Sequence, residues 1–334
     1  MDVTKRNGDI EHRVLAALQD GLPRSRTPYS DMAREIGISV DDLLGVLGNW
    51  QRDGTIRRIG AIVNHFDVGL GDGAMVVWKV AAERTAEVGA LFAGFPEVSH
   101  AYERQTAPGW QYNLYAMVHG ATGEAVGRTV ERMSRAARVS EYLILATRKE
   151  LKKVAPRYVQ LPAACRGESR NSKSEVRSSC RSIDDLDRTI LDALQFEFPL
   201  SERPFDIVAE RLGLDAGLLW SRVEAMLDHG VIRRLGASLD SRKLGFCSTL
   251  AAVRVKEDLV DRAAEIIGRH PEVTHSYLRD HEFNIWFTVI AADTAKIEKL
   301  LDEVRTALSL EASDVLNLPM TRMFKLDARF MARR

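Results

Sequence analysis

The sequence has few cysteines, no excess of charge of either sign and no long apolar run. Its 3 cysteines, Cys165, Cys180 and Cys247, show neither metal-ligand spacing nor the pattern of a disulfide framework. Basic and acidic residues both number 47, whereas a dedicated nucleic-acid-binding protein usually has a basic excess. No stretch approaches the roughly 18 apolar residues that cross a bilayer, and Met1–Glu11 lacks the apolar core of a signal peptide. We therefore expect a reduced, cytoplasmic protein that does not associate with membranes.

A long internal duplication dominates what the sequence does contain. Ile56–Ala61 returns as Ile232–Ala237, and His100–Arg104 returns as His275–Arg279. A period of this length indicates two homologous halves rather than a solenoid. Fused copies often keep the geometry of an isologous dimer, which buries the same patch from both subunits. We therefore expect the two halves to pack as an internal pseudo-dimer.

Each half begins with the pattern of a helix-turn-helix domain. Gly37 and Gly213 are placed to end a second helix, and Ser39 and Asp215 are placed to cap a third. A strand–helix–strand–strand–helix–strand pattern follows in both halves, which is the ferredoxin-like order. We predict an α+β fold, a tandem duplication of a winged helix-turn-helix domain followed by a ferredoxin-like βαββαβ domain. The expected bounds are 8–62 and 184–238 for the helix-turn-helix domains, 63–160 and 239–334 for the ferredoxin-like domains, and 161–183 for a flexible linker.

The predicted third helices argue against DNA binding. The first has two acidic residues, Asp41 and Asp42, at its start and no basic residue before Arg52. The second, Asp215–Asp228, offers only Arg222 against three acidic residues. Acidic residues at the leading end of a recognition helix repel the phosphate backbone. We therefore expect no specific DNA binding.

Polar side chains alternate along two predicted strands of the second half. His275, Tyr277 and Arg279 share one face of the first strand, and Asn284 and Trp286 share a face of the next, because successive strand residues point to opposite sides. The apolar residues between them face a core. The first half carries the matching residues His100, Tyr102 and Arg104.

Three segments carry a resemblance to a known family. Gly236–Phe246, Tyr277–Thr288 and Thr321–Leu326 resemble the siroheme decarboxylases, which are Lrp/AsnC-like proteins. The resemblance implies a carboxy-lyase that removes carbon dioxide from two acetate side chains of siroheme, giving didecarboxysiroheme in d1-haem biosynthesis. It implies no cofactor, because the iron belongs to the substrate, and it makes other proteins of that pathway candidate partners. The alternatives are a DNA-binding regulator of the Lrp/AsnC type that senses a tetrapyrrole, and a tetrapyrrole carrier.

The residues suit a substrate edged by carboxylates. Such a macrocycle needs aromatic surface and guanidinium groups, since arginine binds a carboxylate bidentately. Histidine is the expected proton donor because it titrates near neutral pH. We expect catalysis from His275, His281, Arg279 and Tyr277, with His275 or His281 as an alternative ligand of the substrate iron. The expected substrate-binding residues are Arg57, Arg58, Arg233, Arg234, His100, Tyr102, Arg104, Asn284, Trp286, Arg322 and Lys325.

The two halves differ in the loop between their paired strands. The second half has the short loop Asp280–Phe283, which suits a tight hairpin that holds His281. The first half has the longer Gln105–Tyr112, without an ionisable catalytic group. We therefore expect the principal catalytic site on the second half, with the longer loop covering the macrocycle.

Overall fold

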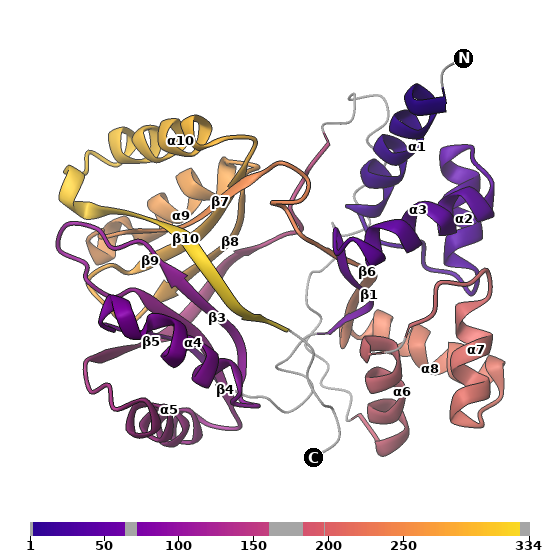
Figure 1. Cartoon of the computed structure of the whole chain (residues 1–334), viewed down its shortest axis with the longest axis horizontal. Helices are drawn as coiled ribbons and strands as arrows, with labels where there is room; N and C mark the ends of the chain where they lie inside the picture. Colours follow the sequence, from indigo (N-terminus) through magenta and orange to yellow (C-terminus); the bar gives the residue numbers. More distant parts are fainter. Residues whose placement is uncertain (1–2, 64–71, 160–182, 197, 328–334) are drawn as a thin grey trace. The chain divides into compact units, whose positions relative to one another are not determined.

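The computed structural model describes residues 3–63, 72–159, 183–196 and 198–327, with side chains described from residue 9 onward. The predicted linker, up to residue 182, and two of the three cysteines lie outside the described residues. The helices are α1 (Val3–Leu18), α2 (Pro28–Ile36), α3 (Val40–Arg52), α4 (Thr85–Ala93), α5 (Gly123–Ala137), α6 (Asp185–Phe196), α7 (Pro204–Leu212), α8 (Ala216–Asp228), α9 (Val260–Arg269) and α10 (Thr294–Ala307). The strands are β1 (Ile56–Val63), β2 (Asp72–Trp78), β3 (Val98–Arg104), β4 (Leu114–Gly120), β5 (Tyr142–Lys153), β6 (Ile232–Leu239), β7 (Cys247–Val253), β8 (Val273–Arg279), β9 (Ile285–Ala291) and β10 (Val315–Leu326) (Figure 1).

The chain forms two compact units, and each unit contains parts of both halves. The helical unit comprises the described residues of Met1–Gly69 and Arg157–Leu244, and the sheet unit comprises those of Leu70–Pro156 and Gly245–Ala328. The α+β class and the duplicated order of elements are thus as predicted. In both units the halves pair strand to strand, as expected of an internal pseudo-dimer.

The helical unit joins its two helix-turn-helix domains through β1 and β6. These strands pair antiparallel, with Gly60 opposite Gly236. A Cβ on Gly60 would lie 2.2 Å from the Leu194 carbonyl oxygen, so only glycine allows this approach. The predicted caps are confirmed, since Gly37 takes a left-handed φ of 69° after α2 and the Ser39 side chain accepts a hydrogen bond at the start of α3.

The sheet unit is one closed sheet in the order β10-β3-β4-β2-β5-β8-β9-β7. The last strand of each half begins in its own half and ends in the other: β5 pairs first with β2 and then with β8, and β10 pairs first with β7 and then with β3. Both strands are longer than the sequence pattern predicts, because their second parts pair with a partner far away in the sequence. Helices α4 and α5 cover the outer face of one half, and α9 and α10 cover that of the other (Figure 1).

Apart from the two apolar clusters beneath the outer helices, a third apolar cluster fills the inside of the closed sheet. Its residues come from both halves. Its strand residues define the inward side of β2, β4, β5, β7, β9 and β10, and we call the inward side of the sheet the inner face. The members of the inner cluster are Met75, Val77, Trp110, Tyr115, Leu145, Leu250, Ala252, Phe283, Trp286, Leu316 and Leu318.

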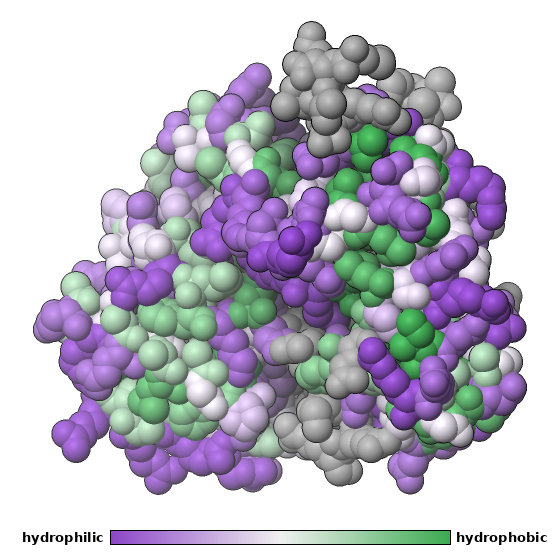
Figure 2. All heavy atoms as spheres, turned by 45° about the vertical axis from the view of Figure 1, so that its right-hand side comes forward, coloured by the Kyte–Doolittle hydropathy of each residue, from purple (hydrophilic) through white to green (hydrophobic). Residues whose placement is uncertain are grey.

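On the molecular surface shown in Figure 2, hydrophilic side chains lie among smaller hydrophobic areas. No helix among the described residues is both long and apolar enough to cross a membrane.

Candidate functional site

Two histidines, one from each half, occupy the inner face of the closed sheet. Strand register places Tyr102 opposite the inner residue Tyr115, and Tyr277 opposite the inner residue Trp286. His100 and His275 lie two residues before these tyrosines on β3 and β8, so they share the inner face. The predicted alternation along both strands is confirmed. We call His100 and His275 the histidine pair.

The histidine pair is electrostatically coupled, and His100 is neutral in the folded protein. The pKa of His100 is lowered to about 3, chiefly by burial and also by the charges of His119, His275 and Lys153, while the charge of Asp327 opposes the shift. Burial also lowers the pKa of His119 to about 4, with a contribution from Lys153. A buried imidazole that carries no charge is a hydrogen-bond donor through one nitrogen and an acceptor through the other.

A hydroxyl group contacts each member of the pair. Ser99 Oγ lies 2.6 Å from Nδ1 of His100 and 2.7 Å from Nε2 of His119, and Thr274 Oγ1 lies 2.9 Å from Nδ1 of His275. Each hydroxyl therefore lies at Nδ1 of its histidine, and at His100 this leaves Nε2 as the ring nitrogen for a ligand. Ser99 is 4% exposed and His119 is 7% exposed, so both are parts of the buried structure.

Two arginines that were expected to contact the substrate, the buried Arg279 and the half-buried Arg104, instead bond to neighbouring strands. Arg279 is 4% exposed, and its guanidinium donates to the Leu145 carbonyl oxygen and to Thr147 Oγ1, both at 2.9 Å. These residues mark the point where β5 passes from one half to the other. Arg104 donates in the same way to the Leu318 carbonyl oxygen on β10, at 3.0 Å. Burial lowers the pKa of Arg279 to about 10, and both guanidinium groups hold strand crossovers rather than presenting an open fork to a carboxylate.

Asn284 and Trp286 also belong to the buried framework. The Asn284 side chain bonds the backbone N–H and carbonyl of Val255, which joins the end of β7 to the start of β9. Trp286 is 1% exposed and donates its indole N–H to the Phe283 carbonyl at 2.7 Å. The expectation that Trp286 packs on a substrate ring is wrong for this structure, because its ring is enclosed by the inner cluster.

His281 lies at the other end of β8 from His275. Arg279 lies four positions along the strand from His275, which is roughly 13 Å, and His281 follows in the loop. Its Nδ1 accepts the backbone N–H of Phe283 at 3.1 Å, and its ring meets Trp110 edge-on at 5.5 Å between centroids. Trp110 is 2% exposed, so the longer loop of the first half inserts into the inner cluster instead of forming a cover. The structure therefore brings His275 together with His100, and not with His281.

The remaining cationic residues lie elsewhere. Arg322 and Lys325 pair in register with Glu103 and Ala101, whose side of β3 is the outer face, and Lys325 donates to the Phe95 carbonyl at 3.0 Å. They therefore point away from the inner face, because strand residues alternate. The arginines that follow the third helices all belong to the helical unit. They are Arg57, which forms an ion pair with Asp240 at 2.9 Å, Arg58, the exposed Arg233 and the half-buried Arg234.

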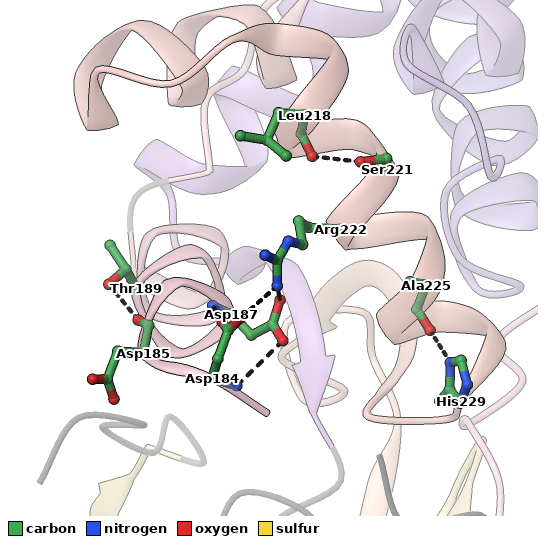
Figure 3. A network of polar contacts seen from close by, with 9 residues as sticks. All are labelled: Asp184, Asp185, Asp187, Thr189, Leu218, Ser221, Arg222, Ala225 and His229. Atoms are coloured by element: carbon green, nitrogen blue, oxygen red, sulfur yellow. Dashed lines mark hydrogen bonds and ion pairs between the residues drawn. The ribbon is translucent and has the colours of Figure 1, made fainter. Parts of the chain in front are cut away.

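The basic residue of the second recognition helix is already engaged in ion pairs. Arg222 points toward α6, where its guanidinium contacts Asp184 at 2.6 Å and Asp187 at 3.2 Å (Figure 3). Arg24 from the first half donates to Asp228 at the end of the same helix, at 2.7 Å. These contacts leave α8 with an acidic, partly covered surface, which is unsuited to a DNA groove.

Comparison with known proteins gives the same architecture. A family model described as the AsnC-like ligand binding domain matches residues 67–152 and 243–325, and one described as the Siroheme decarboxylase NirDL-like HTH domain matches residues 11–57 and 187–233. The siroheme decarboxylase alpha subunit of Nitratidesulfovibrio vulgaris is 42% identical over 154 residues, which cover 46% of this chain and 86% of that subunit. The chain belongs to the siroheme decarboxylase family. The helix-turn-helix domain and the ligand-binding domain each occur twice in this chain, in alternating order.

Further siroheme decarboxylases agree with this assignment. The beta subunit of Methanosarcina barkeri is 39% identical over 145 residues, which cover 43% of this chain and 95% of that subunit. The NirDL subunit of Paracoccus denitrificans is 40% identical over 149 residues, which cover 45% of each chain. The crystal structure of the siroheme decarboxylase NirDL has a TM-score of 0.67 at 25% identity and covers 95% of this chain and 93% of its own. The single subunits thus correspond to about half of this chain, which combines two such copies.

Sequence reasoning missed Ser99, His119 and Lys153. His119 was detectable, because it follows Tyr115 and Met117 at a spacing of two along β4 and therefore shares their inner face. Lys153 was not detectable, because it pairs with His275 only through the crossover of β5. Among the described residues, no group of three or more His, Cys, Asp or Glu side chains is arranged to hold a metal ion.

Proposed function

We propose that this protein is a siroheme decarboxylase, a carboxy-lyase that removes carbon dioxide from two acetate side chains of siroheme. The observation that carries the proposal is the histidine pair, which two homologous halves bring together on the inner face of the family fold. Family membership supports the substrate, and the ion pairs on α8 count against a DNA-binding regulator. The iron is part of the substrate.

The chemistry requires one proton for each carboxylate removed. The carbon–carboxylate bond breaks, its electron pair stays on the methylene carbon, carbon dioxide leaves, and the carbon takes a proton to become a methyl group. We assign proton donation to His275, whose Nδ1 faces Thr274 and which shares the inner face with His100. A positioned general acid supplies roughly 10²–10⁴ in rate. Tyr277 and Tyr102, which lie two residues along from the histidines, are proposed to contact the macrocycle.

His100 and Lys153 are proposed to bind substrate carboxylates. His100 is neutral at physiological pH, because its pKa is about 3, so it acts as an N–H donor rather than as an acid. Lys153 stands opposite His275 in the β5–β8 ladder and its charge reaches both His100 and His119. A lysine is a compact point charge that attracts a carboxylate without requiring bidentate geometry. His281, Arg279 and Arg104 are assigned supporting roles in the fold.

Anaerobic incubation with siroheme, followed by mass spectrometry of the tetrapyrrole, tests the proposal. The expected product has lost two carbon dioxide units. Binding without mass loss would indicate a carrier and overturn the enzymatic proposal. A protein that neither binds nor converts siroheme would overturn the proposed substrate as well.

A further inference from the structure

The two halves surround their histidines differently. In the first half Ser99 contacts both His100 and His119. In the second half Thr274 contacts His275, and the position that matches His119 is Ile290, because the string Asn113–His119 aligns with Asn284–Ile290. An isoleucine side chain has no hydrogen-bonding group. The three-residue chain from His119 through Ser99 to His100 is therefore a feature of the first half.

A serine hydroxyl between two ring nitrogens permits two consistent arrangements. Its single hydrogen is donated to one nitrogen, and its oxygen accepts from the other. If His119 donates from Nε2, Ser99 donates to Nδ1 of His100, and the proton of neutral His100 is on Nε2. If the direction is reversed, Nδ1 of His100 carries the proton and Nε2 is bare. The direction of the chain thus sets whether the open nitrogen of His100 is a donor or an acceptor.

We infer that Ser99 and His119 are positioning residues that hold the proton of neutral His100 on Nε2, so that this ring presents a fixed N–H to a substrate carboxylate. The inference rests on the proposed function, which requires a donor at that nitrogen. It also divides the roles of the histidine pair: His100 binds and orients, and His275 delivers the proton. The surroundings favour a neutral His100, since burial and the nearby His119, His275 and Lys153 disfavour its charged form and only Asp327 favours it.

The tautomer of His100 is measured directly by ¹⁵N-detected NMR of the histidine rings in the full-length protein, without substrate or turnover. The His100 signals are assigned by comparison with the His100→Gln variant. We expect the proton on Nε2 in the wild type, a mixture of tautomers in Ser99→Ala and in His119→Ile, and the wild-type tautomer in His119→Gln. Glutamine keeps an N–H at the place of the histidine Nε2. The matched control is Ile290→Val, which changes the corresponding position of the second half and should leave the His100 signals in place.

Siroheme binding and turnover supply the second readout. Loss of a directed hydrogen bond to a charged group weakens binding roughly 10- to 100-fold. We therefore expect Ser99→Ala and His119→Ile to raise Kd and KM by that factor with a smaller change in kcat, and His119→Gln to restore most of the affinity.

Two results would overturn the inference: a wild-type His100 with its proton on Nδ1, or an unchanged tautomer in both Ser99→Ala and His119→Ile. The wild-type spectrum alone decides the first, even if a variant fails to fold. If the tautomers and siroheme affinities behave as expected but no carbon dioxide is lost, the decarboxylase proposal fails while the positioning role stands.

Discussion

Replacing His119 by isoleucine, the residue that the second half has at the matching position, should remove a loss of stability that mild acid causes in the wild type. Burial lowers the pKa of His119 from 6.5 to about 4 in the folded protein. As the pH falls below about 6.5, the unfolded chain therefore binds a proton that the folded chain does not, and stability is lost until the pH reaches the folded pKa.

The magnitude follows from proton linkage. At pH 5 an unfolded histidine is almost fully protonated, which favours unfolding by about 2 kcal/mol, against about 0.2 kcal/mol at pH 7. The variant lacks this cost but also loses the contact with Ser99, which is worth about 1 kcal/mol. His119→Ile should therefore be less stable than the wild type at pH 7 and about as stable or more stable at pH 5.

Urea unfolding at the two pH values measures this crossover. The helical unit contains Trp50 and Trp220, so replacing both by phenylalanine leaves a fluorescence signal that reports on the sheet unit. Ile290→Val is the matched control, and it should keep the wild-type pH dependence. Equal pH dependence of the wild type and His119→Ile would refute the assignment of a neutral, buried His119.

Three further outcomes are expected. Arg279→Lys should reduce the free energy of unfolding by about 1–3 kcal/mol, because lysine cannot satisfy both Leu145 and Thr147 at the crossover of β5. An unchanged urea midpoint would contradict a stabilising role of these hydrogen bonds. Lys153→Met should raise KM for siroheme several-fold with little change in kcat, and a kcat defect at unchanged KM would contradict a binding role. The wild-type protein should bind promoter DNA no more tightly than random DNA in a salt titration. A sequence-specific footprint at physiological salt would contradict the conclusion that the surface of α8 is unsuited to a DNA groove.

Local pattern was sufficient to predict the elements and the inner face. The helix caps, the duplicated order of strands and helices, and the side of β3 and β8 that carries histidine and tyrosine all follow from the periodicity of neighbouring residues. These features depend on interactions between residues that are close in sequence. The structure therefore agrees with the prediction at Ser39, Gly37, His100 and His275.

Pairing between the halves could not be predicted in the same way. Residues 148–153 are mostly charged and look like the end of a strand, yet they extend β5 into the sheet of the other half. This crossover uses the guanidinium of Arg279, which was expected to bind substrate, and places Lys153 opposite His275. Strand length alone separates His275 from His281, whereas the approach of His275 to His100 depends on a sheet that closes across both halves.

Single-turnover decarboxylation of stoichiometric siroheme by the wild type, His275→Gln and His281→Gln tests the central claim most directly. Each protein is first shown to be folded and to bind siroheme. The wild type should release two carbon dioxide molecules per siroheme, His275→Gln should be slower by roughly 10²–10⁴ because glutamine cannot deliver a proton, and His281→Gln should keep most of the rate. A wild-type protein that returns siroheme unchanged, or a His275→Gln variant that reacts at the wild-type rate, would contradict the account.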